Sequence, residues 1–191
     1  EGVCMRWLSV VMVFIAAVGI LASGVVGCRK GKSSGGKPSF KEFCVSWGAS
    51  NDELAYVCRY GGRGVYVTGD TYSFFNGNIA TFLVRFGEDG SLEWARIFGN
   101  PQSDVESYGL AVGSAGDAYI CGYDSDSGCP FVARIEATGM VGWAKLLDLS
   151  GVSFFELYGL TVDEKGNVFA CGYADDQAIV LRLRSSDGAI D

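Results

Sequence analysis

A unit of about fifty residues recurs along the chain, and it constrains the fold more than any other feature of the sequence. Three short apolar segments, GVYVTG, AYICG and VFACG, end in glycines that stand 53 and 50 residues apart, at Gly69, Gly122 and Gly172. Three further segments, FLVRF, FVARI and IVLRL, carry arginines spaced by 49 and 48 residues, at Arg85, Arg134 and Arg182. Because the same elements return in the same order, the spacing indicates one structural unit used repeatedly.

Within each unit, short segments of β-branched and aromatic residues alternate with Gly, Asp, Asn and Ser, which is typical of antiparallel strands joined by hairpins. The second unit contains four such segments, YGLAVG, AYICGY, FVARIE and VGWAKLL. Short turns containing Gly, such as AGD, KGN, EDGS and ATGM, separate the segments of the different units. The segments are apolar on both faces, so each sheet must be covered on both sides. The sequence therefore predicts an all-β body of about twelve strands in three four-stranded antiparallel blades, preceded by an N-terminal hydrophobic helix.

The order G-x-Y-V-T-G, loop, F-L-V-R-F-x-x-D-G-x-L-x-W, followed by FGN, resembles the repeats of bacterial seven-bladed β-propeller repeat proteins, many of them predicted surface lipoproteins. The resemblance spans residues 41–191 in three copies and implies a partial propeller with blades at about 41–91, 92–140 and 141–191. The family more often has lysine where this chain has the three arginines. Propellers usually have four to eight blades, so we expect either a truncated ring or self-association of three-bladed chains.

The N-terminal segment differs from the rest of the chain. Residues 7–26, WLSVVMVFIAAVGILASGVV, are uncharged over a length that can cross a bilayer as a helix. The residues VVGC resemble a bacterial lipoprotein signal, which implies that residues 1–28 are a signal and anchor, with Cys28 lipidated and Met5 as the true start. The Gly/Ser/Lys-rich residues 29–40 are typical of a flexible linker. We therefore expect an exported body that is tethered to the membrane at the cell envelope.

The flanking charges support a different topology. Only Arg6 precedes the apolar stretch, whereas four cations follow it: Arg29, Lys30, Lys32 and Lys37. Positive flanks tend to stay in the cytoplasm, so the alternative is a single-pass membrane protein with a cytoplasmic body. From Pro38 onward, 21 Asp and Glu residues outnumber 10 Lys and Arg residues. We therefore do not expect the chain to bind nucleic acid, because binding to phosphates needs clustered cations.

The cysteine pattern argues against a zinc site, because the chain has no histidine and its closest cysteines, Cys121 and Cys129, are eight residues apart. Cys121 and Cys171 occupy equivalent positions, where the first unit has Thr68, so small packed side chains are expected there. Cys121 and Cys129 flank GYDSDSG, and a hairpin would bring them together as a candidate disulfide. Cys44 and Cys58 form a second candidate pair. The alternative for both pairs is that the cysteines are reduced.

The stretch DSDSG, residues 124–128, resembles the first half of a calcium loop, with Asp124 and Asp126 as candidate ligands. It lacks a third alternate ligand and a distant glutamate, so a solvated hairpin loop is the favoured interpretation. No other metal or cofactor is expected. The three arginines either bind an anionic ligand on a shared face or pair with acids on neighbouring loops, and the mid-strand position of each favours pairing.

Enzymatic signatures are sparse. The chain has neither histidine nor a G-x-S-x-G nucleophile motif. The stretch ATGMVGW, which ends at Trp143, resembles part of the tryptophan-docking repeat of quinone-dependent propeller dehydrogenases, but Ile135 stands where that repeat has aspartate. The alternative for Trp143 is an aromatic side chain that fills the gap between blades.

We therefore expect a non-catalytic binding or scaffolding module, because loops on a rigid scaffold are frequent sites of recognition. The stretch DTYSFFNGNIAT is predicted to be an inter-strand loop that offers Tyr72, Phe74 and Phe75 to a glycan or an envelope protein. Burial of Phe74 and Phe75 against the next blade is the simpler alternative. A fragment of a quinone-dependent dehydrogenase and a purely structural repeat spacer are the remaining functional alternatives.

Overall fold

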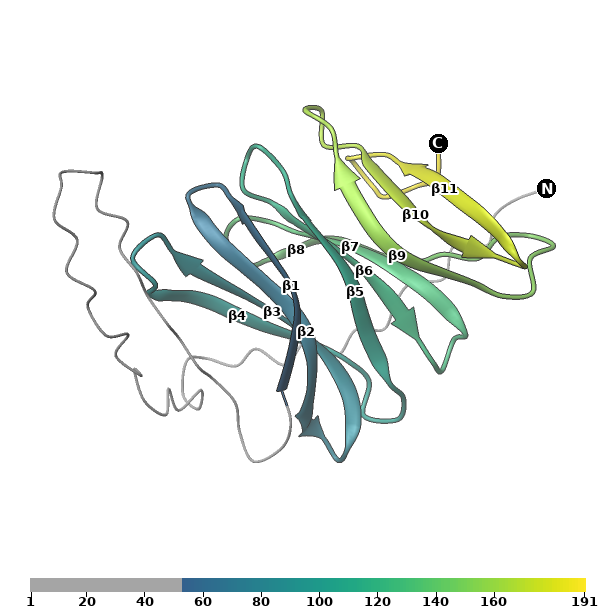
Figure 1. Ribbon diagram of the computed structural model, residues 1–191, viewed down its shortest axis with the longest axis horizontal. Coiled ribbons are helices and arrows are strands. Elements are labelled where there is room, and N and C mark those ends of the chain that lie inside the picture. The colour runs from purple at the N-terminus through teal and green to yellow at the C-terminus, as the bar shows by residue number, and fades with distance from the viewer. Residues whose placement is uncertain (1–52) are drawn as a thin grey trace, which may run out of the picture.

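Every regular element that the computed structural model describes, over residues 53–191, is a β-strand (Figure 1). The first sheet contains, in spatial order, β1 (Glu53–Gly61), β2 (Gly64–Phe75), β3 (Asn78–Gly87) and β4 (Leu92–Phe98). The second contains β5 (Val105–Val112), β6 (Ala118–Asp124), β7 (Cys129–Ile135) and β8 (Val141–Leu146). The third contains β9 (Phe155–Val162), β10 (Val168–Ala174) and β11 (Gln177–Leu183). The prediction of an all-β fold with three antiparallel sheets is confirmed.

The three sheets within residues 53–191 contain four, four and three strands, whereas the sequence predicted about four strands in each. Where a fourth strand of the third sheet was expected, Ile190 makes only an isolated bridge to Leu183. The predicted hydrophobic helix and anchor of residues 1–28, the linker 29–40 and Cys44 lie outside the described residues. No helix in the described part of the chain is long and apolar enough to span a membrane.

The sheets are offset from the repeat intervals counted in the sequence. The intervals 92–140 and 141–191 begin close to β4 and β8, which are the last strands of the first and second sheets. The starting point of a counted interval is arbitrary, because a repeat can be counted from any residue of its unit. In the structure, β4 and β8 are hydrogen-bonded into the same sheets as the three strands that precede them. One counted interval therefore supplies strands to two successive sheets.

The glycine-containing turns predicted from AGD, KGN, EDGS and ATGM close hairpins at one end of the sheets, which we call the glycine-turn end. Gly90, Gly116, Gly139 and Gly166 all have φ between 82° and 87°, a range that other residues rarely adopt. In each turn the glycine N–H donates to a carbonyl three residues earlier, at 2.7–3.0 Å. The predicted turns are therefore confirmed, and glycine is favoured in them because the backbone has a positive φ at these positions.

The other repeated glycines, at positions 69, 122 and 172, serve a different purpose. Each lies opposite a β-bulge in the first strand of its sheet. A Cβ atom at Gly122 would lie 1.8 Å from the carbonyl oxygen of Glu106, and one at Gly172 would lie 1.8 Å from that of Glu156. The bulged strand therefore approaches so closely that no side chain fits, which explains why glycine recurs in every unit.

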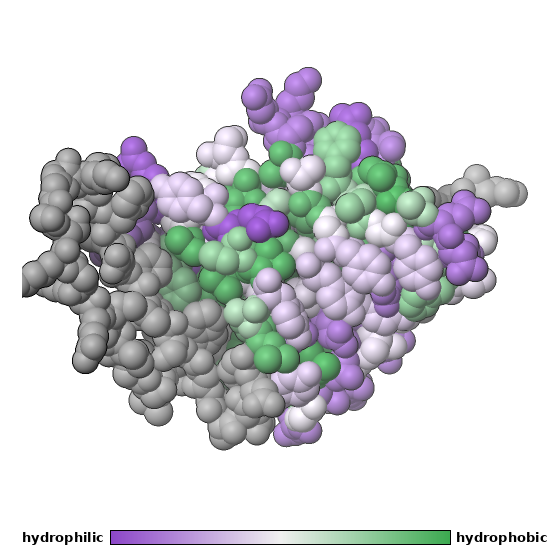
Figure 2. Space-filling view, viewed as in Figure 1, coloured by the Kyte–Doolittle hydropathy of each residue, from purple (hydrophilic) through white to green (hydrophobic). Residues whose placement is uncertain are grey.

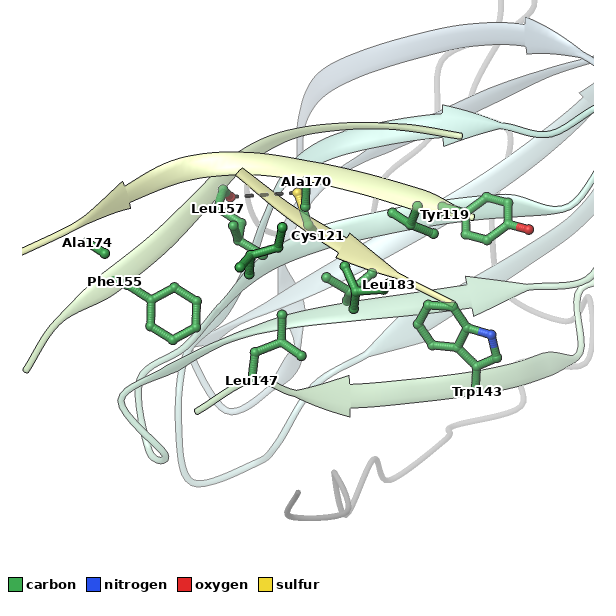
Figure 3. Close-up of a cluster of buried hydrophobic side chains, with 12 residues drawn as sticks. Tyr119, Cys121, Trp143, Leu147, Phe155, Leu157, Ala170, Ala174 and Leu183 are labelled. Carbon is green, nitrogen blue, oxygen red and sulfur yellow. Dashed lines mark hydrogen bonds between the residues drawn. The ribbon is translucent and has the colours of Figure 1, made fainter. Parts of the chain in front are cut away.

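The core lies mainly between successive sheets. Tyr66 and Leu83 of the first sheet pack against Leu110 and Ile120 of the second. Cys121 and Trp143 of the second sheet pack in the same way in a cluster with Leu157 and Leu183 of the third (Figure 3). Burying one such aliphatic side chain stabilises the fold by about 1.5–3 kcal/mol. The repeated apolar positions are thus the contacts that join one sheet to the next.

One sheet face in the described structure stays open. Phe169, Cys171 and Val180 of the third sheet correspond to residues that the following sheet buries in the first two, yet all three are exposed, Val180 at 71%. The third sheet therefore ends the described stack with an uncovered, partly apolar face.

Candidate functional site

The predicted calcium-loop residues hold their own loop together. Asp124 is buried at the end of β6, where its carboxylate accepts hydrogen bonds from the Ser103 hydroxyl and the Asp126 backbone N–H, both at 3.2 Å. Asp126 is exposed in the turn. In the part of the chain that the structure describes, no group of three or more His, Cys, Asp or Glu side chains is arranged to hold a metal ion.

The predicted Cys121–Cys129 disulfide is not present. Cys121 pairs with Val132 across the β6–β7 hairpin, and Cys129 pairs with Asp124, so the two cysteines are three register positions apart. At about 3.3 Å per position, this separation exceeds the reach of a disulfide. Cys121 is instead buried, and its thiol donates to the carbonyl oxygen of Leu157 in the third sheet at 3.6 Å (Figure 3). Its position between sheets agrees with the predicted packing role.

The predicted recognition residues Tyr72, Phe74 and Phe75 belong to strand β2 rather than to a loop. The hairpin turns tightly through Asn76 and Gly77, which both have positive φ, so β2 continues as far as Phe75. Phe75 is buried within the first sheet, Tyr72 is half-buried, and Phe74 is 40% exposed. The loop prediction was wrong because the Asn-Gly turn allows the strands to extend much further than the polar residues suggested.

All three repeated arginines form ion pairs with acids, as the favoured alternative predicted. Arg85 pairs with Glu93 at 3.0 Å, Arg134 with Asp117 at 2.6 Å, and Arg182 with Asp191 at 3.1 Å. Glu93 lies on the adjacent strand β4, whereas Asp117 and Asp191 lie outside the strands. The shared face that would capture an anion is not formed, because each guanidinium is paired with a separate acid.

The repeated tryptophans join successive sheets at the glycine-turn end. The indole Nε1–H of Trp94 donates to the carbonyl of Ala137, and that of Trp143 donates to the carbonyl of Ser185, both at 3.0 Å. A Cβ atom on Gly188 would lie 2.6 Å from the Trp143 ring, so the turn glycine packs flat against the indole. These contacts support the interpretation of Trp143 as an aromatic side chain that fills the gap between blades.

A row of tyrosines that the sequence analysis did not single out runs along the first strands. Tyr56, Tyr108 and Tyr158 are each the extra residue of the bulge opposite a repeated glycine. Tyr56 and Tyr158 are about half exposed, at 52% and 51%. The phenol of Tyr108 donates to Glu106 at 2.8 Å, and that of Tyr158 donates to Glu156. Each bulge therefore turns a tyrosine outward, and in two of the three sheets a carboxylate two residues earlier holds it.

Two of these tyrosines, together with a second group of aromatic rings, form what we call the aromatic surface, which we define as Tyr108, Tyr158, Tyr173, Phe154 and Tyr123. The rings of Tyr108 and Tyr158 lie 5.7 Å apart, and Phe154 lies 5.6 Å from Tyr173 and 6.0 Å from Tyr123. Figure 2 shows weakly hydrophilic side chains gathered over β5 and β9 on this face. A cavity of about 350 Å³ adjoins Phe154 and is also lined by Cys129, Leu146 and Asp148.

Carboxylates and burial raise the pKa of the three bulge tyrosines above that of an ordinary phenol, which is itself protonated at neutral pH. The hydrogen bond to Glu156 raises the pKa of Tyr158 to about 12, and the nearby Tyr173 contributes to the rise. Burial, with the carboxylate of Asp70, raises the pKa of Tyr56 to about 12. Burial followed by Glu106 raises the pKa of Tyr108. At neutral pH each phenol is therefore a hydrogen-bond donor held by an acidic acceptor.

The sequence contains a repeated motif that corresponds to part of this surface. The stretches ESYGL at 106–110 and ELYGL at 156–160 repeat a glutamate two residues before a tyrosine and a glycine after it. Strand residues two apart share a face, so a Glu–Tyr contact follows from the spacing. What the spacing does not reveal is the bulge, which depends on a glycine in the neighbouring strand.

Comparison with known proteins supports the repeat assignment. A family model described as a beta-propeller repeat matches residues 93–123, which run from β4 through β5 and β6 to the residue after Gly122. No curated protein matches the chain. The matched stretch includes Trp94, the Tyr108 bulge and Gly122, three features that recur in the fold. Residues 93–123 are therefore similar to a beta-propeller repeat, and they span parts of two of the three antiparallel sheets.

Proposed function

We propose that this chain is a non-catalytic binding module that recognises a glycan through the aromatic surface, and that Cys28 tethers it at the cell envelope. The observation that supports the binding role is the presence of two groups of packed aromatic rings, Tyr108 with Tyr158 and Phe154 with Tyr123 and Tyr173, of which the second adjoins a cavity of about 350 Å³. The repeated glycines, tryptophans and Cys121 are occupied in packing, whereas Phe154 and Tyr158 are exposed. Their exposure therefore has no packing explanation.

The chemistry of the surface fits a sugar ligand. Tyrosine offers a flat, rigid and partly apolar ring at low entropic cost, together with a hydroxyl that forms hydrogen bonds. Glu106 and Glu156 supply acceptors next to the rings of Tyr108 and Tyr158. A saccharide presents apolar C–H faces and many hydroxyl donors, so it matches both kinds of group.

A glycan array probed with the full chain in mild detergent tests the proposal. We expect Tyr158→Ala and Phe154→Ala each to weaken glycan binding by about tenfold or more, which corresponds to roughly 1.4 kcal/mol. The matched control is Tyr60→Ala, because Tyr60 is exposed and bonded to a carboxylate, Glu88, but lies on β1 outside the surface.

Crosslinking in intact cells completes the test. Capture of an envelope protein that depends on Tyr158 and Phe154, with no glycan bound, would replace the glycan by a protein partner. A folded chain that binds neither class of partner would instead be the structural spacer. Turnover of a substrate by the wild-type chain would contradict the non-catalytic role.

A further inference from the structure

The junction between the first two sheets at the glycine-turn end is filled by an arginine. The Arg85 guanidinium donates to the carbonyl oxygens of Ala137 and Gly62, both at 2.9 Å, and its central carbon lies 5.3 Å from the centre of the Tyr66 ring. Ala137 lies in the β7–β8 turn of the second sheet, so this side chain bridges the first two sheets. A guanidinium is therefore the group that fits between these turns.

The equivalent arginine of the second sheet is held back. Arg134 pairs with Tyr119 across the strands as Arg85 pairs with Tyr66, so the two arginines occupy the same structural position. Both Nε and Nη2 of Arg134 donate to Asp117, at 2.9 and 2.6 Å. In the first sheet Gly64 stands at the position of Asp117, and Arg85 pairs instead through Nε with Glu93 of β4, which leaves its two Nη atoms to bond to the turns at the junction. One aspartate thus keeps Arg134 within its own sheet.

A cavity of about 280 Å³ remains at the second junction, lined by residues that include Tyr119, Asp163, Glu164, Lys165 and Ser185. The second junction has the same kind of hydrogen-bond acceptor as the first. The carbonyl of Ser185 accepts the indole N–H of Trp143, just as the carbonyl of Ala137 accepts the indole N–H of Trp94. Asp117 and Arg134 neutralise each other, which leaves two carboxylates and one ammonium on the wall. The cavity therefore has a net negative lining next to an aromatic ring.

We propose that this cavity binds a guanidinium group supplied from outside the chain, either by a free small molecule or by an arginine side chain of a partner. A planar guanidinium matches carbonyl and carboxylate acceptors and stacks on an aromatic ring, as Arg85 does on Tyr66 at the first junction. This site is separate from the aromatic surface, so the glycan proposal stands or fails independently of it.

Calorimetric titration of the full chain in detergent tests the ligand class. Agmatine represents the free small molecule, and an end-blocked Gly-Arg-Gly peptide represents a partner side chain. We expect at least one of them to bind about tenfold more tightly than its uncharged urea counterpart, carbamoylputrescine or the citrulline peptide. Tighter binding of agmatine indicates a small molecule, and tighter binding of the peptide indicates a partner protein.

Two variants locate the site. Glu164→Lys changes an exposed lining residue, and we expect it to weaken guanidinium binding about tenfold, whereas the same charge change in Asp148→Lys, on the wall of the other cavity, leaves it unchanged. Asp117→Gly removes the carboxylate that retains Arg134, so we expect Arg134 to enter the cavity and guanidinium binding to be lost. Should that variant fail to fold, Glu164→Lys decides the test alone. Equal binding of the uncharged probes, no binding of any probe, or binding of inorganic phosphate that Lys165→Ala abolishes overturns the proposal.

Discussion

Asp70 is a buried carboxylate, 2% exposed, at the position that follows the repeated glycine of the first sheet. The other two sheets have Tyr123 and Tyr173 at this position. Asp70 accepts a hydrogen bond from the backbone N–H of Ser107 in the second sheet at 3.2 Å. Burial raises its pKa to about 6, and the nearby Glu106 adds to the rise, although the bonds from Ser107 and Tyr56 oppose it.

The raised pKa leads to a prediction about pH. A carboxyl whose pKa is higher in the folded than in the unfolded chain binds more protons when folded, so its contribution to stability is lost as pH rises from about 4 to about 6. We expect Asp70→Asn to remove this loss, because an amide keeps the acceptor for Ser107 without the charge. Urea unfolding of both proteins at pH 4.5 and pH 7 checks the prediction. A difference in the free energy of unfolding between variant and wild type that is the same at both pH values would contradict it.

At the scale of the element, glycine and bulge form one unit. The glycine of the second strand lets the carbonyl of the first strand approach, and the bulge that results turns Tyr56, Tyr108 or Tyr158 outward. The same pair of strands thus explains both a repeated residue that packs and a repeated residue that faces solvent.

Gly122→Ala tests this unit. A methyl group would lie 1.8 Å from the carbonyl oxygen of Glu106, so the strands must separate, and we expect the free energy of unfolding to fall by about 2 kcal/mol or more. The control is Gly142→Ala in β8, where the nearest atoms to the new methyl lie at an ordinary 3.6 Å, and a change within about 0.5 kcal/mol is expected. Chemical denaturation measures both. Equal stability of the two variants would show that the close approach is not required.

At the scale of the whole molecule, the two junctions between sheets differ in chemistry. Thr68, Ser107 and Asp70 form hydrogen bonds across the first junction, whereas Cys121, Leu157 and Leu183 pack at the second. The stack ends in the open face with Val180, which is an apolar surface on a strongly acidic chain.

The proposed tether is the prediction at this scale. Metabolic labelling with an alkyne analogue of palmitate is expected to mark the wild-type chain and not Cys28→Ala, because the thiol is the proposed site of lipid attachment. Cys58→Ala is the control, since it removes an exposed cysteine within the first sheet and leaves the label in place. If neither wild type nor Cys28→Ala is labelled and the body resists external protease, the single-pass alternative with a cytoplasmic body replaces the tether.

Much of the architecture was predictable because it depends on local patterns. Turn glycines, strand periodicity and the fifty-residue spacing each act over a few residues, so the sheets, the glycine turns and the packing of Trp143 followed from the sequence. The extent of β2 did not, because an Asn-Gly turn and a segment rich in polar residues gave opposite indications at Tyr72 to Phe75. The disulfide failed for a related reason, since proximity across a hairpin depends on register, and register separates Cys121 from Cys129 by three positions.

The repeated unit, the class of fold and the residues that pack between sheets follow from the sequence alone, because local periodicity and residue size set them. The placement of the side chains that do not pack between sheets follows from the three-dimensional fold. The aromatic surface combines residues of β5, β6, β9 and β10 with Phe154. The cavity beside Arg134 stays open because Arg134 bonds to Asp117 and not to the carbonyl groups at the second junction. Both are set by distances between sheets, which no spacing along the chain specifies.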